Sequence, residues 1–133
     1  AKFSQLFDED FIMFGSKIEQ ISQTNLTYYP YKENIFDYMK VCKGVITLAG
    51  HLTLSECIAY KKPAMVFPIQ DHVEQMLNAY SLEKISYVMY NIEDLRKNLK
   101  KFLDSLGELK DRIPQVEFNG SDQVVDIVHN LLT

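Results

Sequence analysis

Two kinds of segment alternate along the chain. Short runs of apolar and β-branched residues are followed by longer stretches in which apolar residues recur every three or four positions. The first pattern is typical of buried strands and the second of amphipathic helices. Strands are therefore predicted at 11–15, 26–31, 44–50, 64–69 and 87–90. Helices are predicted at 53–60, 71–84, 92–102 and 122–132, and a shorter one runs from a cap at 34 through 39.

Alternation of strand and helix predicts a parallel α/β sheet with right-handed crossovers and helices on both faces. The length of 133 residues favours one domain, spanning 1–133. Ligands of such sheets bind beside the carboxyl ends of the strands. Glycine and polar residues gather at those ends, at 15–16, 31–32, 49–51, 68–71 and 90–91.

The segment Thr53-Leu54-Ser55-Glu56 admits two interpretations. It matches the S/T-x-x-E capping box, in which Thr53 and Glu56 would satisfy backbone N–H groups and nothing more. However, Gly50 permits a sharp turn just before it, and the start of a helix offers free N–H groups and a positive dipole end to a diphosphate. Glu56, one turn into the helix, could then accept hydrogen bonds from the hydroxyls of a ribose.

The next strand leads into a second polar segment, PIQDHVEQMLNA. It carries side-chain types that commonly bind sugars, at Asp71, His72, Glu74, Gln75 and Asn78. Because neighbouring parallel strands end at the same edge, the two segments are expected to form one pocket. The residues alone thus indicate a nucleotide-sugar site.

Composition narrows the range of functions. Hydrophobic residues make up 47% and charged residues 24%, and the net charge of −4 argues against a broad nucleic-acid-binding face. Cys42 and Cys57 form no CxxC pair and are interpreted as reduced thiols. The three histidines lack metal-ligand spacing, so no metal is expected.

The stretch from Val45 to Lys84 resembles the donor-binding motif of GT-B glycosyltransferases, most closely the C-terminal domain of family 28. The same order of glycine, Thr/Ser and Glu, then Pro, an acidic residue, Gln and Asn-Ala marks UDP-glucuronosyltransferases and plant glucosyltransferases. The resemblance implies a Rossmann-like domain, the C-terminal half of a GT-B fold.

The resemblance also implies a role for particular positions. Residues of the turn would hold the donor diphosphate through backbone N–H groups, Glu56 would bind the ribose, and His51 would lie beside the donor. The positions implied for the diphosphate are Gly50, Leu52 and Thr53, those for the transferred sugar Asp71, Glu74 and Gln75, and those for the nucleobase Tyr31 and Lys32.

Three departures from the family pattern stand out. Leu48 occupies a position where many relatives carry His or Arg against the diphosphate, and Ala49-Gly50 replaces the usual Gly-Gly pair. The family's central first strand, in the order 3-2-1-4-5-6, is not found before Phe3. A sheet without that strand exposes unpaired backbone, so we expect these residues to belong to a longer polypeptide.

The resemblance therefore implies a donor-binding domain that takes part in inverting transfer of a hexose or N-acetylhexosamine from a nucleoside diphosphate sugar, with UDP favoured. The nucleotide sugar is a substrate, so no cofactor is expected. Expected partners are this donor and an N-terminal acceptor domain, in the same or a second chain, that holds the catalytic base; no nucleic acid is expected. A cytoplasmic location is expected, including peripheral association with the membrane's cytoplasmic face. The alternatives are a non-catalytic or partner-dependent binding domain and, lower, a sugar-nucleotide epimerase.

Overall fold

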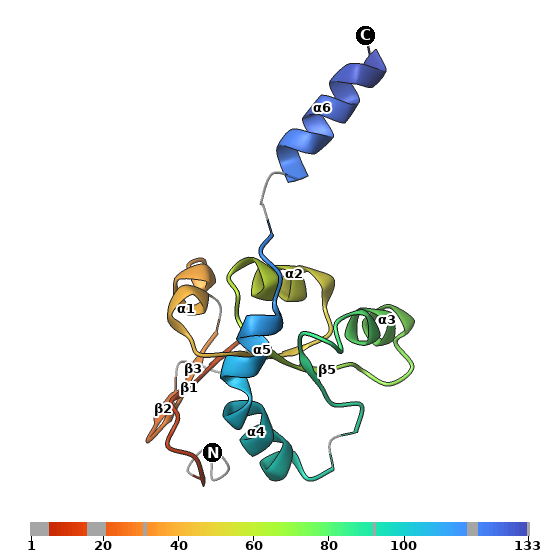
Figure 1. Ribbon diagram of the computed structural model, residues 1–133. Coiled ribbons are helices and arrows are strands. Elements are labelled where there is room, and N and C mark those ends of the chain that lie inside the picture. Colours follow the sequence, from red (N-terminus) through yellow and green to blue (C-terminus); the bar gives the residue numbers. More distant parts are fainter. Residues whose placement is uncertain (1–5, 16–20, 31, 92, 117–119, 133) are drawn as a thin grey trace. The chain divides into compact units, whose positions relative to one another are not determined.

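The computed structural model describes residues 6–15, 21–30, 32–91, 93–116 and 120–132, without the side chains of 21–23 (Figure 1). The chain divides into two compact units, residues 1–40 and 41–133. Each unit contains a three-stranded sheet.

The first unit is built from strands β1 (Phe11–Phe14), β2 (Ile21–Gln23) and β3 (Leu26–Tyr29) and helix α1 (Ile35–Val41). β1 and β3 pair in parallel, as predicted, whereas β2 pairs antiparallel with β3 and was not predicted. An aromatic cluster links the sheet to the helix: the ring centroids of Phe14 and Tyr38 are 5.1 Å apart, and Tyr29 lies 5.8 Å from each.

The second unit has the parallel sheet β4 (Val45–Leu48), β5 (Ala64–Phe67) and β6 (Tyr87–Val88), in that order. Helix α2 (His51–Ala59) connects β4 to β5, and α3 (Val73–Ser81) connects β5 to β6. Both crossover helices lie on one face of this sheet, and α4 (Leu95–Asp104) lies on the other (Figure 1). Helices α5 (Leu106–Arg112) and α6 (Gly120–Leu132) follow.

The core of the second unit lies around β5. Residues Ala64, Met65 and Val66 of this strand are all buried, as its continuous apolar run predicted. From one face Leu54 and Cys57 of α2 pack on the sheet, and from α4 Leu99 and Phe102 are buried. The alternation of strand and helix and the parallel pairing confirm the predicted α/β fold.

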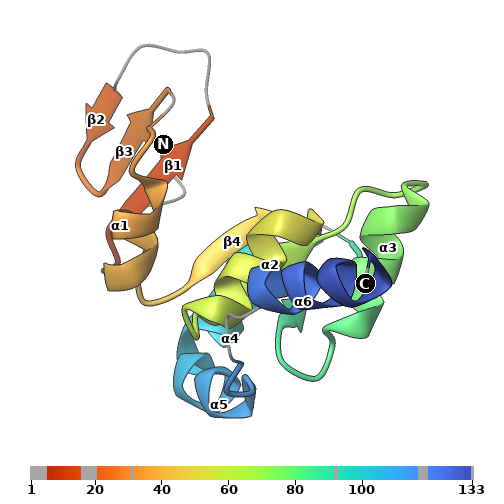
Figure 2. The same cartoon turned by 90° about the horizontal axis from the view of Figure 1, so that it is seen from above.

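Strand β4 is not buried on both faces as its apolar sequence predicted. Ile46 and Leu48 are 47% and 50% exposed. Among the described strands β4 pairs with β5 alone, so it forms an edge of its sheet (Figure 2). Apolar composition predicts that a strand can be buried, and neighbouring strands decide whether it is.

Helix starts were also predicted imperfectly. α2 begins at His51 rather than Thr53, and α3 at Val73 rather than Asp71. α4 begins at Leu95 rather than at 92, because the Asn91 side chain accepts a hydrogen bond from the backbone N–H of Glu93 and so closes a turn before the helix.

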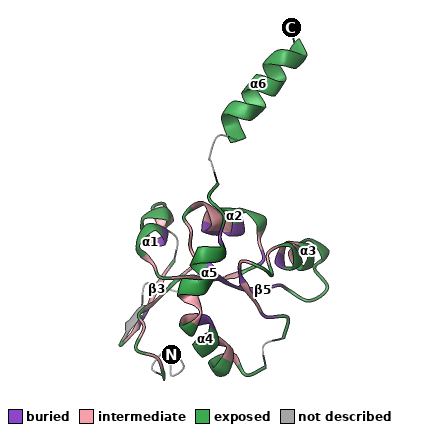
Figure 3. Cartoon of the chain, in the orientation of Figure 1, coloured by how far each residue is buried: buried purple, intermediate pink, exposed green. Residues whose placement is uncertain are grey.

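The apolar stripe of α3 faces outward. Val73, Leu77 and Tyr80 are 72%, 60% and 70% exposed, while Ala79 is buried. α5 was not predicted, and every described residue of α6 is exposed (Figure 3).

Candidate functional site

The turn between β4 and α2 is the centre of the candidate site. Gly50 precedes the helix in extended conformation (φ −73°, ψ 130°) and provides no side-chain cap. The first helical hydrogen bond runs from the N–H of Leu54 to the carbonyl of Gly50 over 3.1 Å. Helix geometry therefore leaves the N–H groups of His51, Leu52 and Thr53 without an intrahelical acceptor.

The capping-box interpretation is wrong. Thr53 already lies inside the first turn, so its side chain cannot cap the helix from the N-cap position. The hydroxyl of Ser55 donates to the carbonyl of His51 over 2.9 Å, and it lies 3.5 Å from Nδ1 of His51. The helix thus begins without a side-chain cap at the carboxyl end of β4. Its first N–H groups are placed to donate hydrogen bonds to a diphosphate.

Glu56 lies in the second turn of α2 and is half-buried. It is four residues beyond Leu52, which corresponds to about 6 Å along the helix axis. That spacing suits a ribose joined to a diphosphate at the helix start. Within the described part of the chain the Glu56 carboxylate makes no hydrogen bond or ion pair, which leaves it available to a ligand.

A second turn, between β5 and α3, borders the site. Asp71 adopts a left-handed conformation (φ 64°) and is exposed. His72 caps α3, its ring accepting from the N–H of Gln75 over 3.5 Å. The side-chain oxygen of Gln75 accepts from the N–H of Ile69 over 3.0 Å. This leaves the amide NH₂ of Gln75 and the exposed carboxylates of Asp71 and Glu74 for sugar hydroxyls.

Asn78 joins the two turns, a role that sequence reasoning missed. Its side-chain amide donates to the carbonyl of Ala49 over 3.0 Å. Ala49 is completely buried and directly precedes Gly50. The bond therefore holds the turn between β4 and α2 from α3. The sequence marked Asn78 only as a polar residue of the motif. The fold alone brings its amide to the carbonyl of Ala49, 29 residues earlier in the chain.

The residues predicted near the nucleobase belong to the first unit. Tyr31 lies outside the described residues. The ammonium of Lys32 lies 4.6 Å from the ring centroid of Tyr29, a cation–π contact within that unit.

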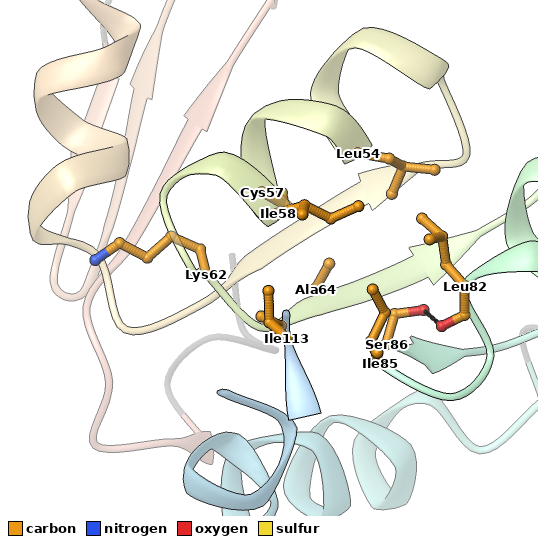
Figure 4. Close-up of a pocket in the computed structure, with 9 residues that line it drawn as sticks. All are labelled: Leu54, Cys57, Ile58, Lys62, Ala64, Leu82, Ile85, Ser86 and Ile113. Atoms are coloured by element: carbon orange, nitrogen blue, oxygen red, sulfur yellow. Dashed lines mark hydrogen bonds between the residues drawn. The ribbon is translucent and has the colours of Figure 1, made fainter. Parts of the chain in front are cut away.

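Beneath α2, a small, partly open pocket of about 10 Å³ is lined mainly by apolar side chains, including Leu54, Cys57 and Ile113 (Figure 4). The Ser86 hydroxyl there donates to the carbonyl of Leu82 over 2.7 Å. Burial raises the pKa of the Cys57 thiol to about 12, with smaller contributions from Cys42 and Glu56. Cys57 is 2% exposed, so it is a packing residue whose burial disfavours the reactive thiolate.

The sequence matches a known protein family. The sequence model described as glycosyl transferase family 1 matches residues 1–107. The chain belongs to this glycosyltransferase family.

Curated relatives agree with that assignment. One relative is a protein of Thermosipho africanus named UDP-N-acetylglucosamine--N-acetylmuramyl-(pentapeptide) pyrophosphoryl-undecaprenol N-acetylglucosamine transferase. The chain is 31% identical to it over 112 residues, which cover 82% of this chain and 33% of that protein. It is 43% identical over 49 residues to an uncharacterized glycosyltransferase of Methanopyrus kandleri, covering 37% and 14%. The chain thus spans about a third or less of the length of these relatives.

Among solved structures, a spinosyn forosaminyltransferase superimposes with a TM-score of 0.64 at 16% identity, covering 84% of this chain and 32% of that one. This likeness confirms the GT-B glycosyltransferase fold. Within the described residues, no helix of this glycosyltransferase chain has the length and apolar character needed to cross a bilayer.

Proposed function

We propose that this chain is the donor-binding part of a glycosyltransferase that transfers a hexose or N-acetylhexosamine from a nucleoside diphosphate sugar, with UDP as the favoured nucleotide. The observation that carries the proposal is the uncapped start of α2, held by Asn78 at the carboxyl end of β4. The Thermosipho relative, named for a UDP-N-acetylglucosamine reaction, supports the choice of donor.

In the proposed complex the diphosphate accepts hydrogen bonds from the backbone N–H groups that begin α2, at Leu52 and Thr53. Gly50 allows close approach because it has no side chain, and nothing lies within 4 Å of its missing Cβ. The exposed ring of His51 stands beside the same turn. We assign to His51 the phosphate contact that the family resemblance implies for a basic residue at the position of Leu48.

The rest of the donor follows from this anchor. Glu56 accepts from the ribose hydroxyls, and Gln75, Asp71 and Glu74 contact the transferred sugar. In the inverting reaction the bond from the anomeric carbon to the diphosphate breaks while the acceptor oxygen bonds to that carbon. The N–H groups of α2 stabilise the charge on the leaving diphosphate, and a base outside this chain takes the acceptor proton.

A partner-dependent or non-catalytic binding domain is the second candidate. The observation that favours it is Leu48, an apolar and half-exposed side chain at a position where the family pattern often has His or Arg. A chain with this role would still bind nucleotide, but it would not transfer sugar without its partner.

Calorimetric titration of the full-length protein with UDP, UDP-N-acetylglucosamine and a dTDP-sugar tests both candidates. We expect the UDP compounds to bind more tightly than the dTDP-sugar. Binding without release of UDP in a sugar-transfer assay would favour the second candidate. Absence of binding by all three nucleotides would refute the proposed function.

A further inference from the structure

The turn between β5 and α3 is closed by a ring of three hydrogen bonds. The backbone N–H of Ile69 donates to Oε1 of Gln75 over 3.0 Å, and the Ile69 carbonyl accepts from the N–H of His72 over 3.2 Å. The third bond runs from the N–H of Gln75 to Nδ1 of His72 over 3.5 Å. Each of these residues contacts the other two, so the position of Gln75 depends on His72.

The bond from Ile69 decides which end of the Gln75 amide is left for a ligand. A backbone N–H can only donate, so it must meet the oxygen of the side-chain amide. The amide nitrogen then points away from the Ile69 backbone with its two N–H donors. At this position the chain therefore offers N–H groups to a sugar oxygen, whereas the exposed carboxylates of Asp71 and Glu74 offer acceptors.

His72 is an unusual residue to begin a helix. Ser, Thr, Asp and Asn are the preferred N-cap residues, and their side-chain oxygens remain acceptors near neutral pH. His72 has the extended backbone of an N-cap (φ −100°, ψ 94°), and its ring nitrogen takes the place of that oxygen. An imidazole accepts through Nδ1 only while it is neutral, and histidines change charge between about pH 5 and 8. The cap of α3 is thus one that a proton removes.

Nothing around His72 replaces the cap once the ring is protonated. The imidazolium would stand at the positive end of the α3 dipole. Among the described residues His72 forms no ion pair, and the carboxylates beside it in the chain, Asp71 and Glu74, are exposed to solvent. From α2, the titratable side chains at the same edge of the sheet are His51 and Glu56, of which the first would repel the imidazolium and the second attract it.

We propose that His72 is a positioning residue for the transferred sugar. In its neutral form it holds Gln75 with the amide N–H groups toward that sugar, and protonation of His72 releases this hold. The proposal rests on the proposed donor function, in which Gln75 contacts the sugar and the start of α2 holds the diphosphate. Loss of the cap should therefore weaken binding of the sugar and leave binding of the nucleotide unchanged.

Calorimetric titration of the full-length protein with UDP and UDP-N-acetylglucosamine tests the proposal in the wild type, His72→Ala and His72→Asn. Asn is the matched control, because it caps helices well and gains no proton in this pH range. At about pH 8, His72→Ala should bind UDP-N-acetylglucosamine roughly three- to tenfold more weakly than the wild type, the value of one hydrogen bond. His72→Asn should restore the wild-type affinity.

The pH profile separates positioning from a purely structural role. At about pH 5.5 the wild type should bind UDP-N-acetylglucosamine as weakly as His72→Ala does, whereas His72→Asn should bind it roughly three- to tenfold more tightly than either. UDP affinity should be equal in the three proteins at each pH. Comparing variants with one ligand at one pH cancels the ionisation of UDP itself and of His51.

A further variant tests the orientation of Gln75. In Gln75→Glu the carboxylate can still accept from the N–H of Ile69, but it has no N–H group for the sugar. We expect it to weaken binding of UDP-N-acetylglucosamine about tenfold and to leave UDP binding unchanged.

Several results would overturn the proposal: equal affinity of the wild type and His72→Ala for the sugar nucleotide at about pH 8, the same pH profile in His72→Asn as in the wild type, an equal loss of UDP affinity in His72→Ala, or unchanged binding in Gln75→Glu. UDP binding by the wild type separates the two claims. Protein that binds UDP, but whose affinity for the sugar nucleotide is absent or indifferent to His72, keeps the donor function and loses the positioning role. A wild type that binds neither ligand refutes the donor function and, with it, the role of His72.

Discussion

Replacing Asn78 with alanine should weaken both the fold and donor binding. The Asn78 amide is the donor to the Ala49 carbonyl, at 3.0 Å, and Ala49 is completely buried. Without this donor, a buried carbonyl loses its partner, which costs about 1–3 kcal/mol of unfolding free energy. The same bond fixes the turn whose N–H groups are proposed to hold the diphosphate.

We expect Asn78→Ala to reduce UDP affinity about tenfold, since a displaced turn would lose roughly one charge-assisted hydrogen bond. Urea unfolding measures the stability and calorimetry the affinity. Ser81→Ala is the matched control, because the Ser81 hydroxyl donates within the same helix to the carbonyl of Leu77 over 2.7 Å. It should change stability by no more than about 0.5 kcal/mol and leave UDP affinity unchanged.

Two results would refute this reasoning in different ways. If Asn78→Ala unfolds at the same urea concentration as the wild type, the bond to Ala49 contributes nothing. If stability falls but UDP affinity does not, Asn78 supports the fold and the turn does not bind the diphosphate.

Three further predictions concern packing and ionisation. Gly44→Ala would place a methyl 2.9 Å from side-chain carbons of Leu106 and Phe102, and it should lower the free energy of unfolding in urea by about 1–3 kcal/mol. In the control Gly107→Ala the new methyl has nothing within 4 Å, so the free energy of unfolding should stay the same or rise. With its pKa raised to about 12, Cys57 should resist maleimide at pH 8 in the folded protein and react once urea unfolds it; rapid native labelling would contradict this. Glu83→Gln should lower the pKa of Tyr90 from about 12, which an alkaline titration reads as phenolate absorbance. The raised pKa of the folded protein means that folding favours the neutral phenol. The wild type should therefore lose this contribution to stability as the pH rises from 10 towards 12. An unchanged tyrosine titration would refute the role of Glu83.

The sequence predicted most of the second unit because its local signals agree with one another. The apolar run around Met65 and Val66 is buried on both faces, and the glycine turn at Gly50 joins strand to helix. Where signals were ambiguous, prediction failed at the helix start. Thr53 is a good capping residue, yet the chain begins its helix at His51 because the backbone turns directly after β4.

Other features could not be read from sequence because they depend on distant partners. Ile46 is apolar in a run that looks buried, but β4 has no second neighbour among the described strands. The apolar stripe of α3 faces outward, and its half-buried polar residues Gln75 and Asn78 face the two turns. The sequence predicted both side chains as sugar contacts, and the fold shows that each one also hydrogen-bonds to the backbone of a turn.

The central claim is that the start of α2 is a nucleotide site with Glu56 as its ribose ligand. Calorimetric titration of UDP into the full-length wild type, Glu56→Ala and the surface control Glu108→Ala on α5 tests it most directly, with the melting temperature of each measured alongside. We predict that Glu56→Ala loses roughly 10- to 100-fold in affinity, the value of hydrogen bonds from a carboxylate to two hydroxyls, while its melting temperature and the affinity of Glu108→Ala stay close to wild type. Equal UDP affinity in all three proteins, or no binding by the wild type, would contradict the account.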